Sequence, residues 1–156
     1  MNETENLRSD NLSQLTHELN RLADFFEKGR DYERMVYQLW NAKDILGHLT
    51  FWHESFARNL SDVANGIQPH PLKGKLSEVN ESSVETTKLV PIKTLIERLS
   101  VAQRTIEQYI FMSSITQIPY KKGARDYSPE EHLEIVSHHI RKHMNDLDKV
   151  YQTEIR

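Results

Sequence analysis

Apolar residues recur every three or four positions along four separate stretches of this chain, and this spacing constrains the fold more than any other feature. The stretches run from about residue 5 to 28, from 41 to 65, from 90 to 113 and from 128 to 151. The period matches the 3.6 residues of a helical turn, so each stretch places an apolar stripe on one helix face. No segment alternates apolar and polar residues as a half-buried strand does. The sequence therefore predicts an all-α protein.

The borders of these stretches carry residues that begin and end helices. Asn41 with Asp44, and Ser128 with Glu131, each match a capping box, in which two residues three positions apart bond to each other's backbone. Gly29 follows the first stretch, where a left-handed cap costs least for glycine. These signals indicate helices that begin near residues 41 and 128 and a first helix that ends just before Gly29.

The connection from Gly66 to about Leu89 is the longest in the chain. Short connections join antiparallel neighbours, whereas a long crossover lets two consecutive helices run parallel. A helix of about 24 residues is roughly 36 Å long, and about 24 extended residues can span that length at roughly 3.3 Å each. One helical turn is expected inside the connection, around Ser82–Thr87. We therefore expect residues 1–156 to form one domain, a four-helix bundle with up-down-down-up topology.

The composition excludes several classes of function. The 156-residue chain contains no cysteine, so it has no thiol nucleophile, disulfide framework or thiolate metal site of its own. A net charge of −3 provides no basic field for a polyanion, so nucleic acid is not an expected partner. The first residues lack the apolar segment of a signal peptide, and no apolar run approaches the roughly 20 residues of a membrane span. We expect a cytoplasmic protein.

Three of the eight histidines have the spacing of a metal site. His139 and His143 are four residues apart in the last helix, so both imidazoles leave the same face one turn apart. His48 lies between Ile45 and Trp52 on the apolar side of the second helix. If the two helices are antiparallel, His48 and His143 lie at depths that agree within one turn. The alternatives are a divalent metal site and histidines that are exposed or bonded to core carbonyls.

Other residues near these histidines have two interpretations each. Asp44 could orient the ring of His48, and Glu54 could act as a general base, or both could be exposed carboxylates. Three aromatic residues could line an apolar pocket or belong to the core: Phe51, Trp52 and Tyr109.

Two further histidines of the last helix are not expected in the site. His132 lies nearly two turns before His139, and His138 points roughly 100° aside and should be exposed. The basic run Lys121–Arg125 before this helix could hold an anionic group or be a solvated loop.

Two segments resemble the DinB/YfiT-like superfamily. Residues 40–53, with the sequence WNAKDILGHLTFWH, resemble the opening of its second helix. Residues 127–133, YSPEEHL, followed by the histidine pair, resemble its last helix. The resemblance implies a four-helix bundle with one metal ion, often zinc or nickel, held by His48, His139 and His143. Within the superfamily the chain looks closest to the ClbS/DfsB branch.

The resemblance leaves more than one function open. The first is a metal-dependent enzyme that acts on a small-molecule substrate, either a hydrolase or a thiol-dependent transferase, and homodimers are common in such families. Met144 and Asn145 stand where many relatives carry Arg and Gly-Gln, which weighs against the thiol-dependent interpretation. The alternative is a ClbS/DfsB-like small-molecule binding or self-protection protein in which the metal is absent or dispensable. An interaction module without a site is the third hypothesis.

Overall fold

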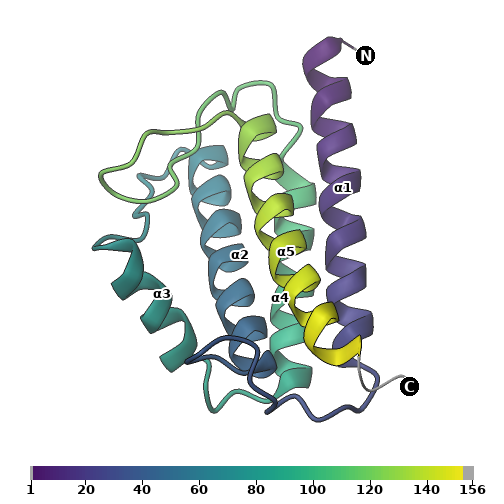
Figure 1. The fold of residues 1–156 in the computed structure, drawn as a ribbon. Coiled ribbons are helices and arrows are strands. Elements are labelled where there is room, and N and C mark those ends of the chain that lie inside the picture. Colours follow the sequence, from purple (N-terminus) through teal and green to yellow (C-terminus); the bar gives the residue numbers. More distant parts are fainter. Residues whose placement is uncertain (1, 153–156) are drawn as a thin grey trace.

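Four long helices lie side by side, and a shorter helix packs against the outside of one of them (Figure 1). The computed structural model describes residues 2–152, and this part contains five helices and no β-strand. The bounds are α1 Glu3–Phe26, α2 Ala42–Ala64, α3 Leu76–Glu85, α4 Ile92–Tyr109 and α5 Pro129–Tyr151. Residues 1 and 153–156 of the expected domain lie outside the described part.

The chain follows the predicted up-down-down-up topology. In Figure 1, α1 and α5 run in one direction, whereas α2 and α4 run in the opposite direction and are parallel to each other. α1 packs against α5, α2 packs against α4, and α3 lies on α2. The prediction of an all-α four-helix bundle with a long crossover between its second and third long helices is therefore confirmed.

The crossover between α2 and α4 contains more structure than the sequence predicted. We expected one turn around Ser82–Thr87, whereas α3 is a ten-residue helix over Leu76–Glu85. Val79 and Val84 are its buried apolar residues, and Lys75 at its N-cap makes no side-chain bond. Two buried apolar positions and no capping side chain give too weak a periodic signal for a prediction from sequence.

Both predicted capping boxes are present. The Asn41 side chain accepts from the backbone N–H of Asp44 at 2.8 Å, and the Asp44 carboxylate accepts from the backbone N–H of Asn41 at 3.0 Å. Ser128 and Glu131 make the same reciprocal pair at 3.2 and 3.0 Å. α1 ends at Phe26 with Glu27 as its C-cap in the right-handed region, so Gly29, with a φ of 66°, lies in the turn two residues beyond the cap and not at the cap predicted for it. The caps fix where α2 and α5 begin, and hence where their histidines lie.

The helix predicted over residues 90–113 is shorter in the structure. α4 ends at Tyr109, about four residues earlier than expected. Just beyond it, the guanidinium of Arg8 donates to three backbone carbonyls at 3.1–3.2 Å, those of Ile110, Met112 and Ile115. Because these carbonyls bond to a side chain of α1, the backbone leaves the helical path at this point.

Apolar side chains from the four long helices fill the interior. Fully buried members are Leu15, Leu22, Ile45, Leu46, Leu60, Leu95, Ile106, Leu133 and Leu147. Each such side chain contributes about 1.5–3 kcal/mol relative to exposure to water, so this core dominates the stability of the bundle. Among the described residues, no helix combines the length and the hydropathy needed to cross a membrane.

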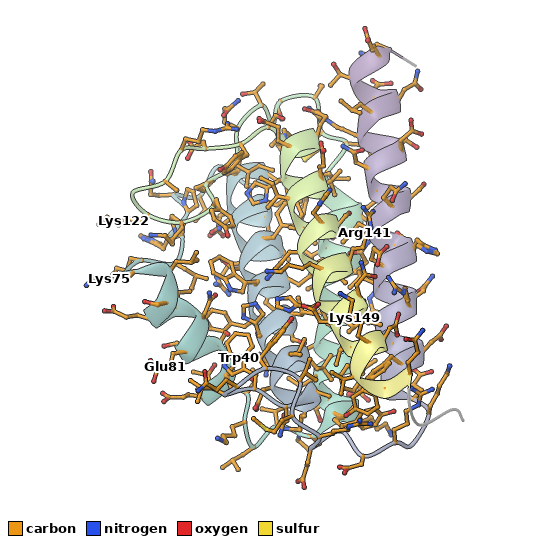
Figure 2. All side chains as sticks on the ribbon, viewed as in Figure 1. Trp40, Lys75, Glu81, Lys122, Arg141 and Lys149 are labelled. Carbon is orange, nitrogen blue, oxygen red and sulfur yellow. The ribbon has the colours of Figure 1, made fainter. Side chains whose placement is uncertain are left out.

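Charged side chains cover the outside of the bundle. Lys75, for example, points away from it in Figure 2, and Lys149 is exposed as well. The buried carboxylate of Glu18 on α1 lies 3.2 Å from Nε of Arg141 on α5 and 3.3 Å from Arg21. The Glu18–Arg141 pair joins α5 to α1, whereas Arg21 belongs to α1 itself.

Candidate metal centre

The structure brings the three histidines of the predicted site together between α2 and α5. His48 projects from α2, and His139 and His143 project from consecutive turns of α5. The Nε2 atoms of His48 and His139 are 3.0 Å apart, and those of His139 and His143 are 3.1 Å apart. One ring nitrogen from each of the three residues lies within 4.8 Å of the other two. The sequence spacing therefore predicted the cluster correctly.

A hydrogen-bond chain from α3 orients His48. Its Nδ1 lies 2.9 Å from Oγ of Ser83, and this hydroxyl donates to the carbonyl of Asn80 at 2.5 Å. A carbonyl only accepts, so the single proton of Ser83 is committed to it and Nδ1 of His48 must be the donor. In a neutral imidazole the other nitrogen is then unprotonated. The lone pair on Nε2 of His48 therefore points into the cluster.

A second chain orients His143 in the same way. The hydroxyl of Tyr37 donates to a carboxylate oxygen of Asp146 at 2.5 Å and lies 2.7 Å from Nδ1 of His143. Burial, followed by the hydrogen bond to Asp146, raises the pKa of Tyr37, so the phenol keeps its proton. Nδ1 of His143 must then donate to the phenol oxygen. Nε2 of His143 is consequently a second lone pair that points into the cluster.

The three rings are uncharged at neutral pH. Burial lowers the pKa of His139 to about 4, and the neighbouring charges of His143 and Lys142 act in the same direction. Burial and then Lys142 lower the pKa of His143 to about 4, although Asp146 opposes the shift. Burial, followed by the other two histidines, lowers the pKa of His48 further. Neutral imidazoles are the form that binds a metal ion.

The cluster fits a divalent metal ion. Nitrogen ligands about 2.0–2.1 Å from one ion lie about 3.3 Å apart in a tetrahedral arrangement, close to the 3.0 and 3.1 Å observed. Two lone pairs that face each other in a buried site repel unless a proton or a cation lies between them. With no cysteine in the chain, three imidazoles make an all-nitrogen ligand set suited to zinc, nickel or copper.

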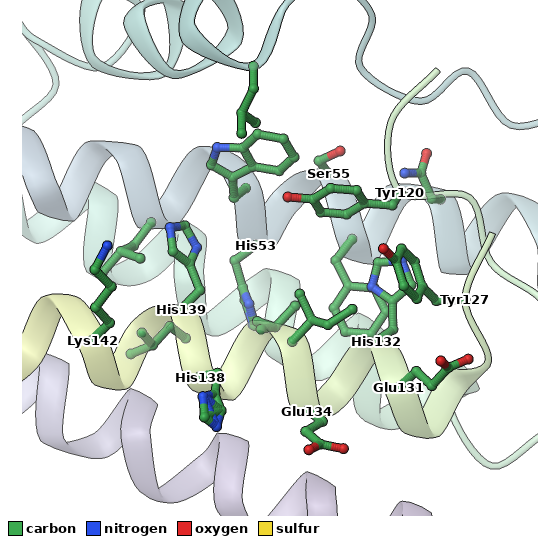
Figure 3. A pocket seen from close by; sticks show the side chains of 18 of the residues that line it. His53, Ser55, Tyr120, Tyr127, Glu131, His132, Glu134, His138, His139 and Lys142 are labelled. Atoms are coloured by element: carbon green, nitrogen blue, oxygen red, sulfur yellow. The ribbon is translucent and has the colours of Figure 1, made fainter. Parts of the chain in front are cut away.

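A cavity of about 850 Å³ opens beside the cluster (Figure 3). α2, α3, α5 and the loop before α5 supply its walls, and His139 is the member of the cluster that lines it. The rings of Trp52 and Tyr120 stack on one wall, with centroids 5.2 Å apart and planes 17° apart. A small molecule in this cavity therefore has direct access to His139.

The two carboxylates considered from the sequence have other roles, so the functional interpretation of each was wrong. Asp44 is committed to the capping box of α2, and Ser83 takes the place next to His48 that we considered for Asp44. Glu54 forms a bidentate pair with Arg98 on α4, at 3.1 and 2.5 Å. Neither carboxylate lines the cavity.

Some of the other aromatic and histidine candidates line the cavity, and others do not. Trp52 lines the cavity, whereas Phe51 and Tyr109 do not. His138 is exposed, as expected, and lies at the cavity wall. His132 is outside the cluster, as predicted, but it is fully buried in the same cavity.

The supporting residues Tyr37, Ser83 and Asp146 were not found from the sequence. Asp146 follows His143 by three positions and so lies on the same helix face, which was an available signal. Tyr37 lies in a connection without a periodic pattern, and Ser83 lies in a helix predicted as a single turn. Only the packed structure brings these two side chains to the histidines.

Comparison with known proteins supports the fold. The sequence matches no family model, and no curated protein matches it. A crystal structure of a histidine-to-alanine mutant of mycothiol-dependent maleylpyruvate isomerase matches 90% of this chain and 60% of its own, with a TM-score of 0.72 and 9% identity. A second structure, of the mycothiol-dependent maleylpyruvate isomerase, matches 93% of this chain and 59% of its own, with a TM-score of 0.62 and 13% identity.

These similarities concern the fold and not the activity. The chain spans about 60% of the length of the chains that it matches. Fold and site together define a DinB-like four-helix bundle with a three-histidine cluster between its second and last helices.

Proposed function

We propose that the protein is a metal-dependent enzyme that acts on a small molecule, with His48, His139 and His143 holding zinc or nickel. The observation that carries this proposal is the convergence of the three Nε2 atoms, two of them fixed as lone pairs by Ser83 and by Tyr37. Three protein ligands leave a coordination position open, which is typical of catalytic rather than structural sites. The adjoining cavity provides room for a substrate.

Thiol-dependent transfer or isomerisation fits the site better than hydrolysis. A bound divalent metal lowers the pKa of an incoming water or thiol, and it deprotonates a thiol without a separate base. The cavity wall has two carboxylates, and Glu131 is committed to Arg125 and to the cap at Ser128. Glu134 is exposed and lies five residues, or about 7.5 Å, before His139 along α5. Neither carboxylate is placed as a general base that would assist hydrolysis.

The thiol has to come from a second molecule, because the chain has no cysteine. The two structurally similar chains are those of a mycothiol-dependent enzyme, which supports a low-molecular-weight thiol as co-substrate. Met144 and Asn145, which weighed against this interpretation, do not line the cavity: Met144 is buried in the core, and Asn145 accepts a hydrogen bond from Arg21. Their identity therefore does not alter the wall that a thiol contacts.

Metal content is the decisive measurement. We expect about one equivalent of zinc or nickel in the wild-type protein and none in His48→Ala or His139→Ala. His138→Ala is the matched control, since this histidine lies on the same helix beside His139 but outside the cluster. Metal retained in both cluster variants would contradict the proposed site.

The alternative is a ClbS/DfsB-like binding or self-protection protein in which the metal is dispensable. The size of the cavity and its aromatic wall favour this alternative independently of the histidines. Ligand affinity that is unchanged after complete chelation and in His139→Ala would support it. Ligand affinity that falls with the metal would support the enzyme.

A further inference from the structure

Buried polar atoms without partners gather along the cavity. In the described part of the chain, buried side-chain atoms that make no hydrogen bond occur on His53, Ser55, Asn59, His132 and Ser137. The first four of these residues line the cavity, and Ser137 does not. Each unsatisfied buried group costs about 1–3 kcal/mol, and native proteins keep few of them. Their concentration around one cavity indicates a place where hydrogen bonds are made to something other than the protein.

Three of these residues lie at the end of the cavity away from the histidine cluster. Ser55 and Asn59 are four residues apart on α2, so their side chains share one helix face. His132 faces them from α5 and is seven residues before His139, a separation of about 10.5 Å along the helix. We call Ser55, Asn59 and His132 the polar subsite.

Three aromatic rings pack around His132. It stacks on Phe56 with centroids 4.5 Å apart, and the rings of Tyr120 and Tyr127 each lie 5.9 Å away. Neither of its ring nitrogens makes a hydrogen bond of ordinary geometry. Burial lowers the pKa of His132 to about 4, against the effects of the Pro119 carbonyl and Glu131. The neutral ring has one nitrogen that donates and one that accepts.

Tyr120 covers the polar subsite. Its ring is stacked on that of Trp52 and edge-on to that of His132, and Figure 3 shows it among the side chains that line the cavity. Asn80 fixes the indole by accepting from its Nε1 at 2.9 Å, whereas Tyr120 belongs to the loop between α4 and α5. The indole face is therefore a fixed stacking platform, and Tyr120 is the ring that a flat ligand would replace.

The charged side chains that line the cavity are paired with each other or exposed, and none of them is a member of the polar subsite. Arg125 and Glu131 are paired with each other at 2.8 Å, and Arg125 lies over the ring of Tyr127. Glu134 and Lys142 are exposed. A hydroxyl, an amide and a neutral imidazole recognise donors and acceptors but cannot compensate a buried charge. The subsite chemistry thus selects an uncharged group.

We propose that the polar subsite binds a flat, uncharged group that both donates and accepts hydrogen bonds, such as a carboxamide carried on an aromatic ring. The ring stacks on Trp52 in place of Tyr120, and the amide bonds to Ser55, Asn59 and His132. This proposal rests on the proposed function in one respect. The polar subsite lies about 10 Å from the histidine cluster along the helix axis, so the other end of the same ligand is the part that reaches the cluster.

The test uses benzamide as the probe and benzoate as its charged counterpart. Trp40→Phe leaves Trp52 as the single tryptophan, so quenching of its fluorescence reports stacking. In this background we expect benzamide to bind at least tenfold more tightly than benzoate. His132→Phe and Ser55→Ala should each weaken benzamide at least tenfold. Ser137→Ala is the matched control, because its hydroxyl is also buried and unpartnered but lies outside the cavity.

Thermal unfolding distinguishes a binding role from a structural one. Because neither ring nitrogen of His132 makes a hydrogen bond of ordinary geometry, a phenyl ring in the same aromatic surroundings should leave the melting temperature unchanged or raise it. A lower melting temperature with unchanged benzamide affinity would show that His132 is structural and would overturn the proposal. No benzamide binding, or equal affinity in all variants, would also overturn it and would leave ordered water as the partner of these atoms.

The measurements are made with chelated protein and with zinc-loaded protein. If the proposed metal site is wrong, the protein binds no zinc but still binds benzamide. If the proposed polar subsite is wrong, the protein binds zinc but does not bind benzamide. The two results are therefore separable.

Discussion

The hydroxyl of Tyr37 lies 2.7 Å from Nδ1 of His143 and donates its own proton to Asp146. This relationship fixes the tautomer of His143, because a phenol whose proton is committed can only accept from the ring. It joins the connection before α2 to the last helix. Tyr37, in a segment without periodic structure, thereby determines which ring nitrogen of His143 faces the cluster.

Tyr37→Phe should weaken metal binding about 10–100-fold, the usual effect of losing a residue that orients a ligand. The phenyl ring keeps the packing but no longer accepts from Nδ1 of His143. Competition with a chromogenic zinc chelator measures the change. Tyr109→Phe is the control, since Tyr109 is half-buried and does not line the cavity. Equal losses in both variants would point to a general structural effect and not to orientation of His143.

Gly47→Ala should destabilise the protein by about 1–3 kcal/mol through overpacking. A Cβ at Gly47 would lie 2.0 Å from Oγ1 of Thr87 and 2.8 Å from its Cβ, although alanine is intrinsically the better helix residue by about 1 kcal/mol. Since Thr87 follows α3, the clash also displaces the helix that carries Ser83. Urea unfolding measures the loss.

Thr87→Ala in the Gly47→Ala background is the check on this mechanism. It removes Oγ1, the nearest atom, and should restore part of the lost stability. It leaves the Cβ contact at 2.8 Å, so recovery should be incomplete. A double variant no more stable than Gly47→Ala alone would contradict the steric explanation.

The helices with a periodic apolar pattern were predicted from the sequence, whereas the features that depend on packing between distant segments were missed. Four amphipathic helices and two capping boxes carry local signals, so the bundle and the levels of His48, His139 and His143 could be predicted from the sequence. α3 has too few apolar positions for such a signal.

The supporting shell of the cluster depends on contacts between distant segments. Ser83 and Tyr37 reach the histidines only because α3 packs on α2 and the connection before α2 contacts α5. The choice between the two interpretations of Asp44 also depended on packing, because Ser83 of α3 and not Asp44 lies next to Nδ1 of His48. Local patterns identify what a residue can do, and packing decides between the possibilities.

Arg8→Met should cost about 3–5 kcal/mol, the usual effect of breaking a buried ion pair by removing one partner. Arg8 is buried, pairs with Glu130 at the start of α5 and donates to three carbonyls after α4. Its removal leaves a carboxylate and those carbonyls without their donor. Chemical denaturation measures the effect, and Arg8→Met with Glu130→Gln should recover part of it. An exposed arginine such as Arg58 is the control, with an expected change below about 0.5 kcal/mol for Arg58→Met.

The stability of the metal-free protein should fall steeply as the pH drops from about 6.5 towards 4. Burial lowers the pKa of four histidines to about 4, namely His53, His132, His139 and His143, against about 6.5 in the unfolded chain. Between these two values the unfolded state binds protons that the folded state does not, so stability is complete above about pH 6.5 and is lost below it. Each histidine contributes about 1.4 kcal/mol per pH unit in this window.

Urea unfolding in the presence of a chelator, repeated from about pH 7.5 to 4.5, measures this slope. His132→Phe removes one of the four histidines without touching the cluster, so it should reduce the slope by about 1.4 kcal/mol per pH unit. Excess zinc at neutral pH should add about 2.7 kcal/mol at a concentration about 100-fold above its dissociation constant, and this increment should shrink as acid protonates the ligands. A stability that stays constant from about pH 7 to 5 would mean that these rings are charged, or accessible to protons, in the folded protein.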